Sequence, residues 1–314
     1  MNNAIEITQM TKYYGNVVGI KKVDLNIPVG SIFGYLGPNG AGKSTTIRCL
    51  LGILKPQNGE ISVLGKKITN WNEQLSLKEK IGYLPGEFNL YSHLTVKKIL
   101  DYFDSLRKSP CTLRSELVEL FEIDESKKTS QLSKGNKQKI GIVQALMHDP
   151  DLIILDEPTS GLDPLMQQKL YSLLKGFRER NKTIFFSSHN LSEVQKICDE
   201  VAVIKDGSIV NHDSMEGLSN RMQRKIIITV EKALDIEKIL NFPFVSHCTK
   251  SDENNNFGQN GSIRYYIWLN TLNPDYASVL SSLNQFKIKN LVIPEPNLED
   301  YFLQYYKEKK GSEN

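Results

Sequence analysis

The sequence has few cysteines, little excess charge and no long apolar run. Its four cysteines, Cys49, Cys111, Cys198 and Cys248, lie far apart and form no CxxC pair, which argues against a disulfide framework or a zinc site. Lysine and arginine total 39 against 36 acidic residues, so bulk charge does not favour nucleic acid as a partner. Apolar runs such as 152–155 stop far short of the ~20 residues that span a membrane.

The amino terminus, MNNAIE, has no basic stretch followed by an apolar one, so we predict no secretory signal. Apolar residues make up 39% and charged residues 24% of the 314, which is the composition of a globular protein. At roughly 100–200 residues per domain, this length predicts two domains.

The first domain is predicted to span residues 1–217 and to have an α/β fold. Short apolar runs alternate with helical patterns, and continuous runs such as Ile153–Leu155 are typical of strands buried on both faces of a parallel sheet. A stretch from about 87 to 149 has helical patterns without a strand, and we interpret it as a helical insertion. The predicted strands are 5–8, 31–36, 60–63, 81–84, 151–155, 183–187, 201–205 and 208–211.

Residues 218–314 predict a second, smaller α+β domain. Strand and helix patterns follow in the order β-α-β-β-α-β, which is that of a ferredoxin-like unit. A last helix is expected at 298–306, where Leu298, Phe302 and Tyr306 recur at i, i+4 and i+8 and form one apolar face.

A phosphate-binding loop is the strongest chemical signal. The run Gly37-Pro38-Asn39-Gly40-Ala41-Gly42-Lys43-Ser44-Thr45 fits G-x-x-x-x-G-K-[ST] between a predicted strand and a predicted helix. Glycines allow the backbone N–H groups and the helix N-terminus to surround a phosphate. Lys43 is expected to reach the β- and γ-phosphates, and Ser44 to ligate Mg²⁺.

Two carboxylates, Asp156 and Glu157, follow the apolar run 152–155 at the carboxyl end of a predicted strand, where α/β sheets place ligands. Beside a phosphate-binding loop, Asp156 is expected to organise Mg²⁺ through its water shell. Glu157 is expected to polarise the water that attacks the nucleotide.

Three further motifs distinguish between the families of nucleotide-hydrolysing proteins that have a phosphate-binding loop. Leu132–Gln138 precedes a helix, Ser160–Asp163 follows Glu157, and Ser187-Ser188-His189 ends the next strand. Over about residues 4–213 the sequence resembles the ATP-binding-cassette (ABC) ATPases, which are P-loop NTPases. Residues 296–302, PNLEDYF, make the second domain similar to the accessory domain of bacterial ABC exporter ATPases for drugs and antimicrobial peptides.

The resemblance implies roles for single residues. Tyr14 matches the aromatic residue that stacks on adenine, with Tyr13 as a near competitor. His189 matches the switch histidine, which contacts the γ-phosphate and holds the catalytic geometry. The histidines without such a context are interpreted as structural or solvated: His93, His148, His212 and His247.

The resemblance also implies a site shared by two chains. Ser133 and Gly135 match signature positions that bind the γ-phosphate of ATP held by the opposite subunit, and Asp163 matches the loop that joins the two sites. Lys134 and Asn136 depart from the usual L-S-G-G-Q, and Lys134 adds a charged side chain where the subunits meet.

A second departure follows the predicted strand at 81–84. The family usually has a glutamine here that touches Mg²⁺ and water and senses the membrane partner, whereas this chain has Gly86 and then Glu87. Glu87 takes that role as a carboxylate ligand of the metal, or the coupling contact is rebuilt from other residues.

The implied function is an ATP-hydrolysing subunit of a bacterial ABC exporter. Two cassettes, identical or paralogous, would close head to tail around two Mg-ATP and drive separate transmembrane permease subunits at the cytoplasmic face of the membrane. A mechanical role at the membrane, as in cell-division cassettes, is the alternative. Chromosome-type cassettes need a long insertion, and only about 90 residues separate Lys43 from Ser133. A GTP switch would need an Asn-Lys-x-Asp motif, which the sequence lacks.

Overall fold

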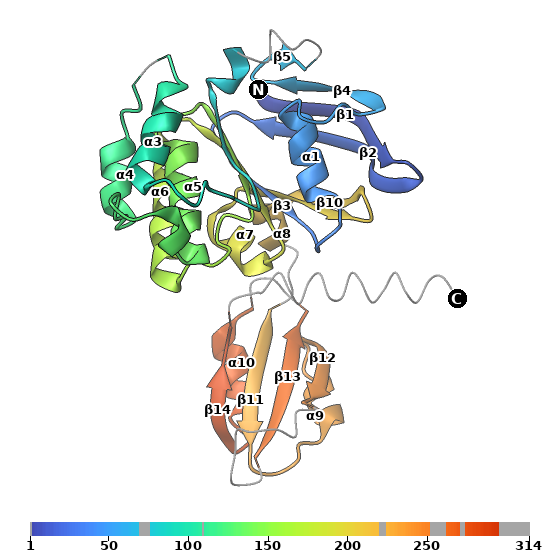
Figure 1. The fold of residues 1–314 in the computed structure, drawn as a ribbon. Helices are drawn as coiled ribbons and strands as arrows, with labels where there is room; N and C mark the ends of the chain where they lie inside the picture. Colours follow the sequence, from blue (N-terminus) through green and yellow to red (C-terminus); the bar gives the residue numbers. More distant parts are fainter. Residues whose placement is uncertain are drawn as a thin grey trace. The chain divides into compact units, whose positions relative to one another are not determined.

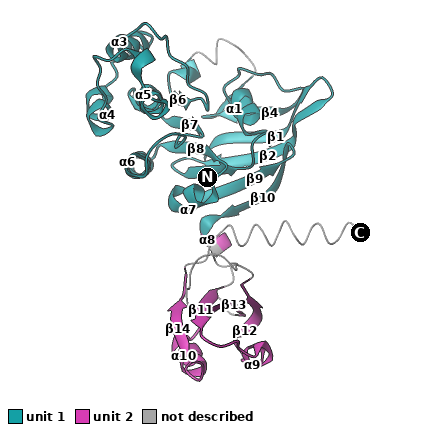
Figure 2. Ribbon diagram, turned by 60° about the horizontal axis from the view of Figure 1, so that its bottom comes forward, with its two compact units in different colours: residues 1–215 teal, residues 216–314 magenta. Residues whose placement is uncertain are grey.

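The chain divides into two compact units, Met1–Met215 and Glu216–Asn314, which Figure 2 colours separately. The computed structural model describes residues 2–68, 76–108, 110–219, 224–251, 262–270 and 274–294. Within these ranges, no helix combines the length and the apolar composition that a membrane crossing requires.

A six-stranded sheet forms the centre of the first unit. Five of its strands are parallel, and the sixth pairs antiparallel with its neighbour through the Asp206-Gly207 turn, where both residues have positive φ. In spatial order the strands are β10 (Ser208–Ser214), β9 (Glu200–Lys205), β3 (Ile32–Leu36), β8 (Thr183–Ser188), β7 (Leu152–Asp156) and β6 (Ile81–Leu84). The central strands β3, β7 and β8 are buried throughout, as the apolar runs predict.

A second, antiparallel sheet accompanies the parallel one. Its order is β2 (Val17–Pro28), β1 (Asn3–Tyr14), β4 (Asn58–Val63) and β5 (Lys66–Lys67). The strand pattern did not predict β2, although Val23, Leu25 and Ile27 alternate cleanly. In the first half of β2 the alternation of apolar and polar residues is interrupted. There the pairing with β1 shifts register, and Lys22 has φ 49°.

Helices flank both sheets (Figure 1). In the first unit they are α1 (Lys43–Leu50), α3 (Val96–Ser105), α4 (Arg114–Leu120), α5 (Lys134–Leu146), α6 (Pro164–Glu179) and α7 (Leu191–Ile197), with a 3-10 turn at Thr129–Gln131. The short helix α8 (Met215–Ser219) begins where this unit ends. Between 87 and 149, the described residues hold α3, α4, the 3-10 turn and α5, and no strand. Asp163 caps α6 by accepting a hydrogen bond from the Met166 N–H at 2.9 Å.

One apolar core joins the two sheets of this unit. Met10 and Leu25 of the antiparallel sheet, Phe185 and Ile204 of the parallel sheet, and Ile47 of α1 belong to the same buried cluster. The helix that follows the glycine-rich loop is therefore fixed between two layers, which positions the loop itself.

The second unit has the ferredoxin-like topology. Its sheet order is β12 (Val245–Lys250), β13 (Ile263–Leu269), β11 (Lys225–Val230) and β14 (Ile288–Val292), with all neighbours antiparallel. Helix α9 (Ile236–Leu240) connects β11 to β12, and α10 (Tyr276–Leu283) connects β13 to β14. Both helices contribute to a separate buried cluster. The helix expected at 298–306 lies outside the described residues.

His148 makes the stability of the first unit sensitive to acid. Its Nε2 contacts the Ile81 carbonyl at 3.2 Å, and its Nδ1 is buried without a hydrogen-bond partner. Burial, with the nearby Arg107 charge, lowers the pKa of His148 from 6.5 to about 4. The unfolded chain therefore takes up a proton that the folded chain refuses, and stability is lost as the pH falls from about 6.5 towards 4.

We expect the wild type to lose more stability than His148→Gln as the pH falls. Between pH 7 and pH 5, the difference between their free energies of unfolding should decrease by about 1–2 kcal/mol. Urea unfolding at the two pH values measures this difference. Substitution of the exposed His93 by glutamine is the control. A wild-type minus His148→Gln difference independent of pH would contradict the assignment.

Candidate active site

The glycine-rich loop connects β3 to α1 and bends sharply at two glycines. Gly40 has φ 81° and Gly42 has φ 110°, in the region where a side chain is strained. A Cβ on Gly42 would also lie 2.6 Å from the Gly19 carbonyl oxygen. Only glycine therefore fits at position 42, at the start of the helix whose free N–H groups face an incoming anion.

Lys43 is held over this loop. Its Nζ donates to the carbonyl oxygens of Gly37 at 2.6 Å and Pro38 at 3.2 Å. The same Nζ lies 3.2 Å from Oε1 of Glu157, and the Lys43 side chain is only 6% exposed. The ammonium group is thus a positive charge buried at the loop, and Glu157 is its one carboxylate contact in the described chain.

Asp156 ends β7 and is buried between two hydroxyl donors. Ser44 Oγ donates to its Oδ2 at 2.7 Å, and Ser187 Oγ donates to its Oδ1 at 2.5 Å. Burial, together with the Asp156 carboxylate, raises the pKa of the nearby Tyr83 to about 12, so that hydroxyl remains protonated at neutral pH. The carboxyl end of β7 therefore joins the first turn of α1 through the Ser44–Asp156 contact.

Glu157 follows directly and adopts a left-handed backbone conformation with φ 52°. Such strain is held by surrounding contacts and is frequent at functional sites. Its N–H donates to the Ser187 carbonyl at 3.2 Å, and its carbonyl accepts from Gln138 Nε2 at 3.3 Å. Its carboxylate lies between the Lys43 ammonium and His189 Nδ1, which is 2.7 Å from Oε2.

Two supporting residues were not predicted from the sequence. Glu193 of α7 is buried and accepts from Thr159 Oγ1 at 2.8 Å and from Ser188 Oγ at 2.6 Å. It therefore fastens the loop after Glu157 to the strand end before His189. Gln138 of α5 also donates to the Pro158 carbonyl at 3.0 Å. Sequence spacing carries no signal for either contact, because the partners lie 34 and 20 residues away.

A cavity of about 570 Å³ opens over these groups. Tyr14 lines it and Tyr13 does not, and the Tyr14 hydroxyl lies 3.4 Å from Thr45 Oγ1. The predicted site residues that line it are Tyr14, Pro38, Asn39, Gly40, Gly42, Lys43, Ser44, Thr45, Glu87, Asp156, Glu157 and His189. Its size and its lining, which combines the Tyr14 ring with backbone and charged groups, suit a nucleoside triphosphate.

Five predicted residues do not line this cavity: Gly37, Ala41, Ser133, Gly135 and Asp163. The Gly37 carbonyl still accepts a hydrogen bond from Lys43 Nζ, and Ala41 is a buried residue of the loop. Ser133 is exposed and caps α5 by accepting from the Asn136 N–H at 3.2 Å. Within one chain, these signature residues therefore do not contribute to the site.

Lys134 and Gly86 are the departures from the common motifs that approach the cavity. Lys134 is exposed and lines it together with Ser160. A Cβ on Gly86 would lie 3.3 Å from Asp156 Oδ2, so this glycine lies directly beside the buried Asp156 carboxylate. Glu87 is exposed beside it.

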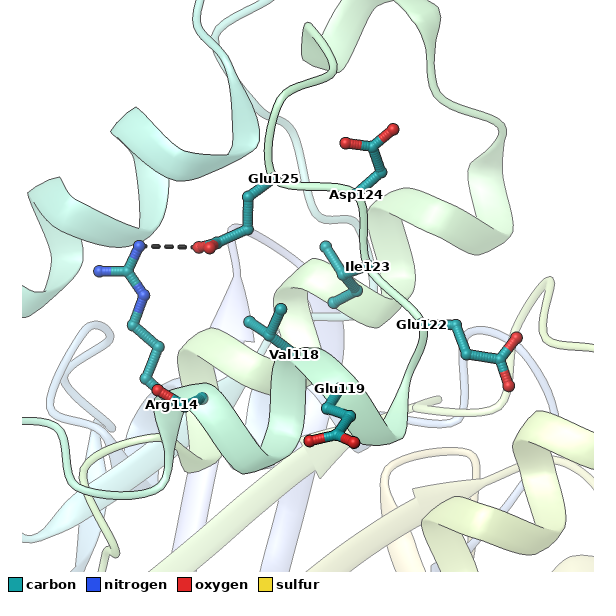
Figure 3. A pocket seen from close by; sticks show the side chains of 8 residues that line it. Arg114, Val118, Glu119, Glu122, Ile123, Asp124 and Glu125 are labelled. Atoms are coloured by element: carbon teal, nitrogen blue, oxygen red, sulfur yellow. Dashed lines mark hydrogen bonds and ion pairs between the residues drawn. The ribbon is translucent and has the colours of Figure 1, made fainter.

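A separate hollow on the helical segment, shown in Figure 3, shares no residue with this cavity. Val118 and Ile123 lie in it, and acidic side chains surround it. Arg114 holds Glu125 at 2.8 Å, and Lys169 binds Glu122 at 2.6 Å. These ion pairs give Glu122 and Glu125 a structural role: they tie the segment after α4 to Arg114 of α4 and to Lys169 of α6.

A parallel sheet with a glycine-rich loop after β3, and two carboxylates at the end of β7 with β8 lying between these strands, defines a P-loop NTPase. Residues 20–160 match the ABC transporter family. The chain is 32% identical to the bacitracin transport ATP-binding protein BcrA of Bacillus licheniformis, over 97% of each protein. It is 34% identical to the protein of the same name from Enterococcus faecalis, over 96% of each.

Solved structures agree with this relationship. A dimeric bacterial ABC transporter cassette, MJ0796, is 27% identical and superposes with a TM-score of 0.63, over 67% of this chain and 98% of the cassette. A post-hydrolysis dimer of the same cassette, bound to ADP and Pi, has 26% identity, a TM-score of 0.62 and the same coverage. The chain belongs to the ABC transporter family, as an ATP-binding subunit that hydrolyses ATP.

Proposed function

We propose that two copies of this cassette, or one copy and a paralogue, close around two Mg-ATP and drive separate membrane subunits that export a drug or antimicrobial peptide. The main structural support for ATP hydrolysis in this proposal is the position of Glu157. Its carboxylate lies at a strand end, between the P-loop lysine and His189. Relatives named for bacitracin transport over nearly the whole chain support the export role.

The donor set fits magnesium. Ser44 Oγ and Asp156 Oδ2 lie 2.7 Å apart, and both are oxygen ligands of the kind that Mg²⁺ prefers. The described residues hold no cluster of three or more His, Cys, Asp or Glu that could enclose a metal alone. This agrees with an ion bound by one or two protein oxygens, substrate phosphates and water. Bound there, Mg²⁺ would neutralise phosphate charge, with Glu87 as a further carboxylate at the cavity.

Each of the remaining side chains at the site has its own role in ATP binding or hydrolysis. Lys43 balances the charge of the β- and γ-phosphates, and the N–H groups of residues 37–45 surround them. Glu157 accepts a proton from the attacking water as it approaches the γ-phosphate. His189 holds the Glu157 carboxylate in place and reaches the γ-phosphate from its exposed position. Tyr14 offers its ring to the adenine.

Ser133 and Gly135 complete the site from the partner cassette, and Asp163 lies in the loop that joins the two sites. Ser133 is exposed and Gly135 is half-buried in their own chain, and the related cassette structures are dimers. The small excess of 39 basic over 36 acidic residues does not favour nucleic acid as a partner. The chain would act at the cytoplasmic face of the membrane, through its membrane subunits.

Lys134 is expected to strengthen ATP-driven closure through its attraction to phosphate. Lys134→Gln should weaken ATP-induced dimerisation by a few-fold, about the effect of one exposed charge, whereas Lys134→Arg should preserve it. Sedimentation at low and high salt measures the effect, because screening reduces the contribution of an exposed charge. Equal dimerisation of wild type and Lys134→Gln at both salt concentrations would place the ammonium in solvent.

The second unit is an accessory domain that contributes no catalytic group. Its buried cluster, which includes Ile228, Ile267 and Val279, is separate from the core of the cassette. We expect truncation after residue 217 to leave ATP binding intact while weakening dimerisation or transport, and a fragment of residues 219–314 to fold alone. Calorimetry with ATP and the circular dichroism of the fragment test this. A truncated cassette without ATP binding would contradict it.

Purification of the full chain from membranes tests the transport role. Detergent extracts should yield a multi-span subunit bound to the wild type and to Lys43→Ala alike. In vesicles, the wild-type complex alone should export a drug or peptide in the presence of ATP. Recovery of the chain without any multi-span partner would overturn the proposal, while leaving its ATPase activity measurable.

A further inference from the structure

Glu193 of α7 is a buried carboxylate that connects the two segments carrying Glu157 and His189. Its Oε1 accepts a hydrogen bond from Thr159 Oγ1 at 2.8 Å, and its Oε2 accepts one from Ser188 Oγ at 2.6 Å. All three of these side chains are buried. Thr159 lies two residues after Glu157, and Ser188 directly precedes His189, so one side chain holds both segments.

The two segments need such a connection because they lie at the end of the sheet. The ladder between β7 and β8 ends at the pair of Asp156 with Ser187. The His189 side chain is 60% exposed, so packing does not fix its position. Its Nδ1 nevertheless lies 2.7 Å from Glu157 Oε2, and this contact depends on how the two strand ends are held.

Other hydrogen bonds keep the same loop attached to the fold without Glu193. Gln138 Nε2 donates to the carbonyl oxygens of Glu157 at 3.3 Å and Pro158 at 3.0 Å. The Ser160 N–H also donates to the Glu157 carbonyl, at 3.2 Å. Loss of the Glu193 carboxylate should therefore displace Glu157 relative to His189 without unfolding the unit.

The stability of the fold does not require a charge at position 193. The two hydrogen-bond partners of Glu193 are neutral hydroxyls, and no ion pair of Glu193 occurs within the described ranges. A buried carboxylate without a cation costs free energy that a neutral amide of the same shape does not. Hydrogen bonds to a carboxylate are, however, shorter and stronger than those between neutral groups. The charge thus favours a tight connection over maximal stability.

We propose that Glu193 is a positioning residue for ATP hydrolysis, whose two hydrogen bonds hold Glu157 and His189 in the arrangement that turnover requires. This inference rests on the roles that the proposed function gives to Glu157 and His189. Glu193 does not line the nucleotide cavity, so it acts through these two residues. A displacement of about 1 Å at a catalytic group can cost on the order of 10²-fold in rate. The effect therefore falls on kcat rather than on the affinity for ATP.

Two variants of Glu193 separate position from stability. Glu193→Ala removes both hydrogen bonds and should lower kcat by roughly 10- to 100-fold, with the Kd for ATP within about twofold of the wild type. Glu193→Gln should lower kcat only a few-fold, because the amide can accept from Thr159 and donate to Ser188 Oγ. The amide variant should also unfold at the same or a higher urea concentration than the wild type, since no buried charge remains. Phosphate release, ATP calorimetry and urea unfolding provide the three measurements.

A double-mutant cycle tests whether Glu193 acts through Thr159. Thr159→Val replaces the hydroxyl with a methyl group and should lower kcat several-fold. In the Glu193→Ala chain, the same substitution should have no further effect on kcat, because the hydroxyl has already lost its acceptor. The control is Glu125→Gln, which breaks an ion pair with Arg114 away from the cavity and should leave kcat unchanged.

A wild-type kcat in the folded Glu193→Ala and Thr159→Val chains would overturn the inference. Additive effects in the cycle, or a loss confined to ATP affinity, would also overturn it. Thr159→Val and Glu193→Gln carry the test if Glu193→Ala does not fold.

The Glu157→Gln chain separates this inference from the proposed function. If hydrolysis is slow in Glu157→Gln and normal in the Glu193 variants, only the positioning role is wrong. If Glu157→Gln hydrolyses ATP at the wild-type rate, the assignment of the base is wrong and the positioning role fails with it.

Discussion

Replacement of Glu157 by glutamine is expected to slow ATP hydrolysis by roughly 10²-fold or more, the scale of a lost general base, while ATP binding is retained. The amide is nearly isosteric and keeps a contact for His189, whose Nδ1 lies 2.7 Å from the carboxylate. It cannot accept a proton from water. Phosphate release under steady-state conditions and ATP titration calorimetry separate the two effects.

The control for this variant is Glu179→Gln, which changes an exposed carboxylate near the end of α6. It should hydrolyse ATP at the wild-type rate. Turnover of Glu157→Gln near that rate would remove Glu157 from the role of base and leave it as a structural partner of Lys43.

Replacement of Lys43 by alanine is expected to weaken ATP binding itself, by roughly 10- to 100-fold, the equivalent of a charge-assisted hydrogen bond. The Lys43 side chain is 6% exposed, and its ammonium group donates to the Gly37 carbonyl of the loop at 2.6 Å. Its loss also frees Glu157 from an ion pair at 3.2 Å. The unpaired Glu157 carboxylate would also repel phosphate, so both effects lower the nucleotide affinity that calorimetry measures.

Lys175→Ala is the matched control, because Lys175 is exposed on α6 and does not line the cavity. An ATP affinity of Lys43→Ala equal to that of this control would show that the lysine does not contact phosphate. A chain that unfolds on substitution would be recognised from its circular dichroism, and Lys43→Met, which keeps the length of the stem, would replace it in the titration.

The sequence predicted the parts of the site that depend on local order. Lys43 and Ser44 follow a strand and open a helix, so the motif fixes their place in the chain. The family resemblance implied that Glu157 and His189 belong to one site, and the structure explains their meeting, because β7 and β8 are adjacent parallel strands whose carboxyl ends share one edge. Resemblance to a known family supplied the candidate roles of the remaining residues.

Other features depend on tertiary packing and have no local signature. Glu193 was not predicted, since its two hydroxyl partners lie on segments that only the folded chain brings together. Strand β2 was not predicted because register shifts and the positive φ of Lys22 interrupt its alternation. The pairing of Lys43 with Glu157 joins residues 114 positions apart and follows from the sheet order rather than from spacing.

The structure of the Glu157→Gln chain with ATP and Mg²⁺ is the most direct measurement of the central claim. It should show a dimer in which Lys43 contacts phosphate oxygens, Ser44 and Asp156 face the metal, and Ser133 of the partner subunit approaches the γ-phosphate. ATP bound away from the loop of residues 37–45, or a complete nucleotide site within a single chain, would contradict the account.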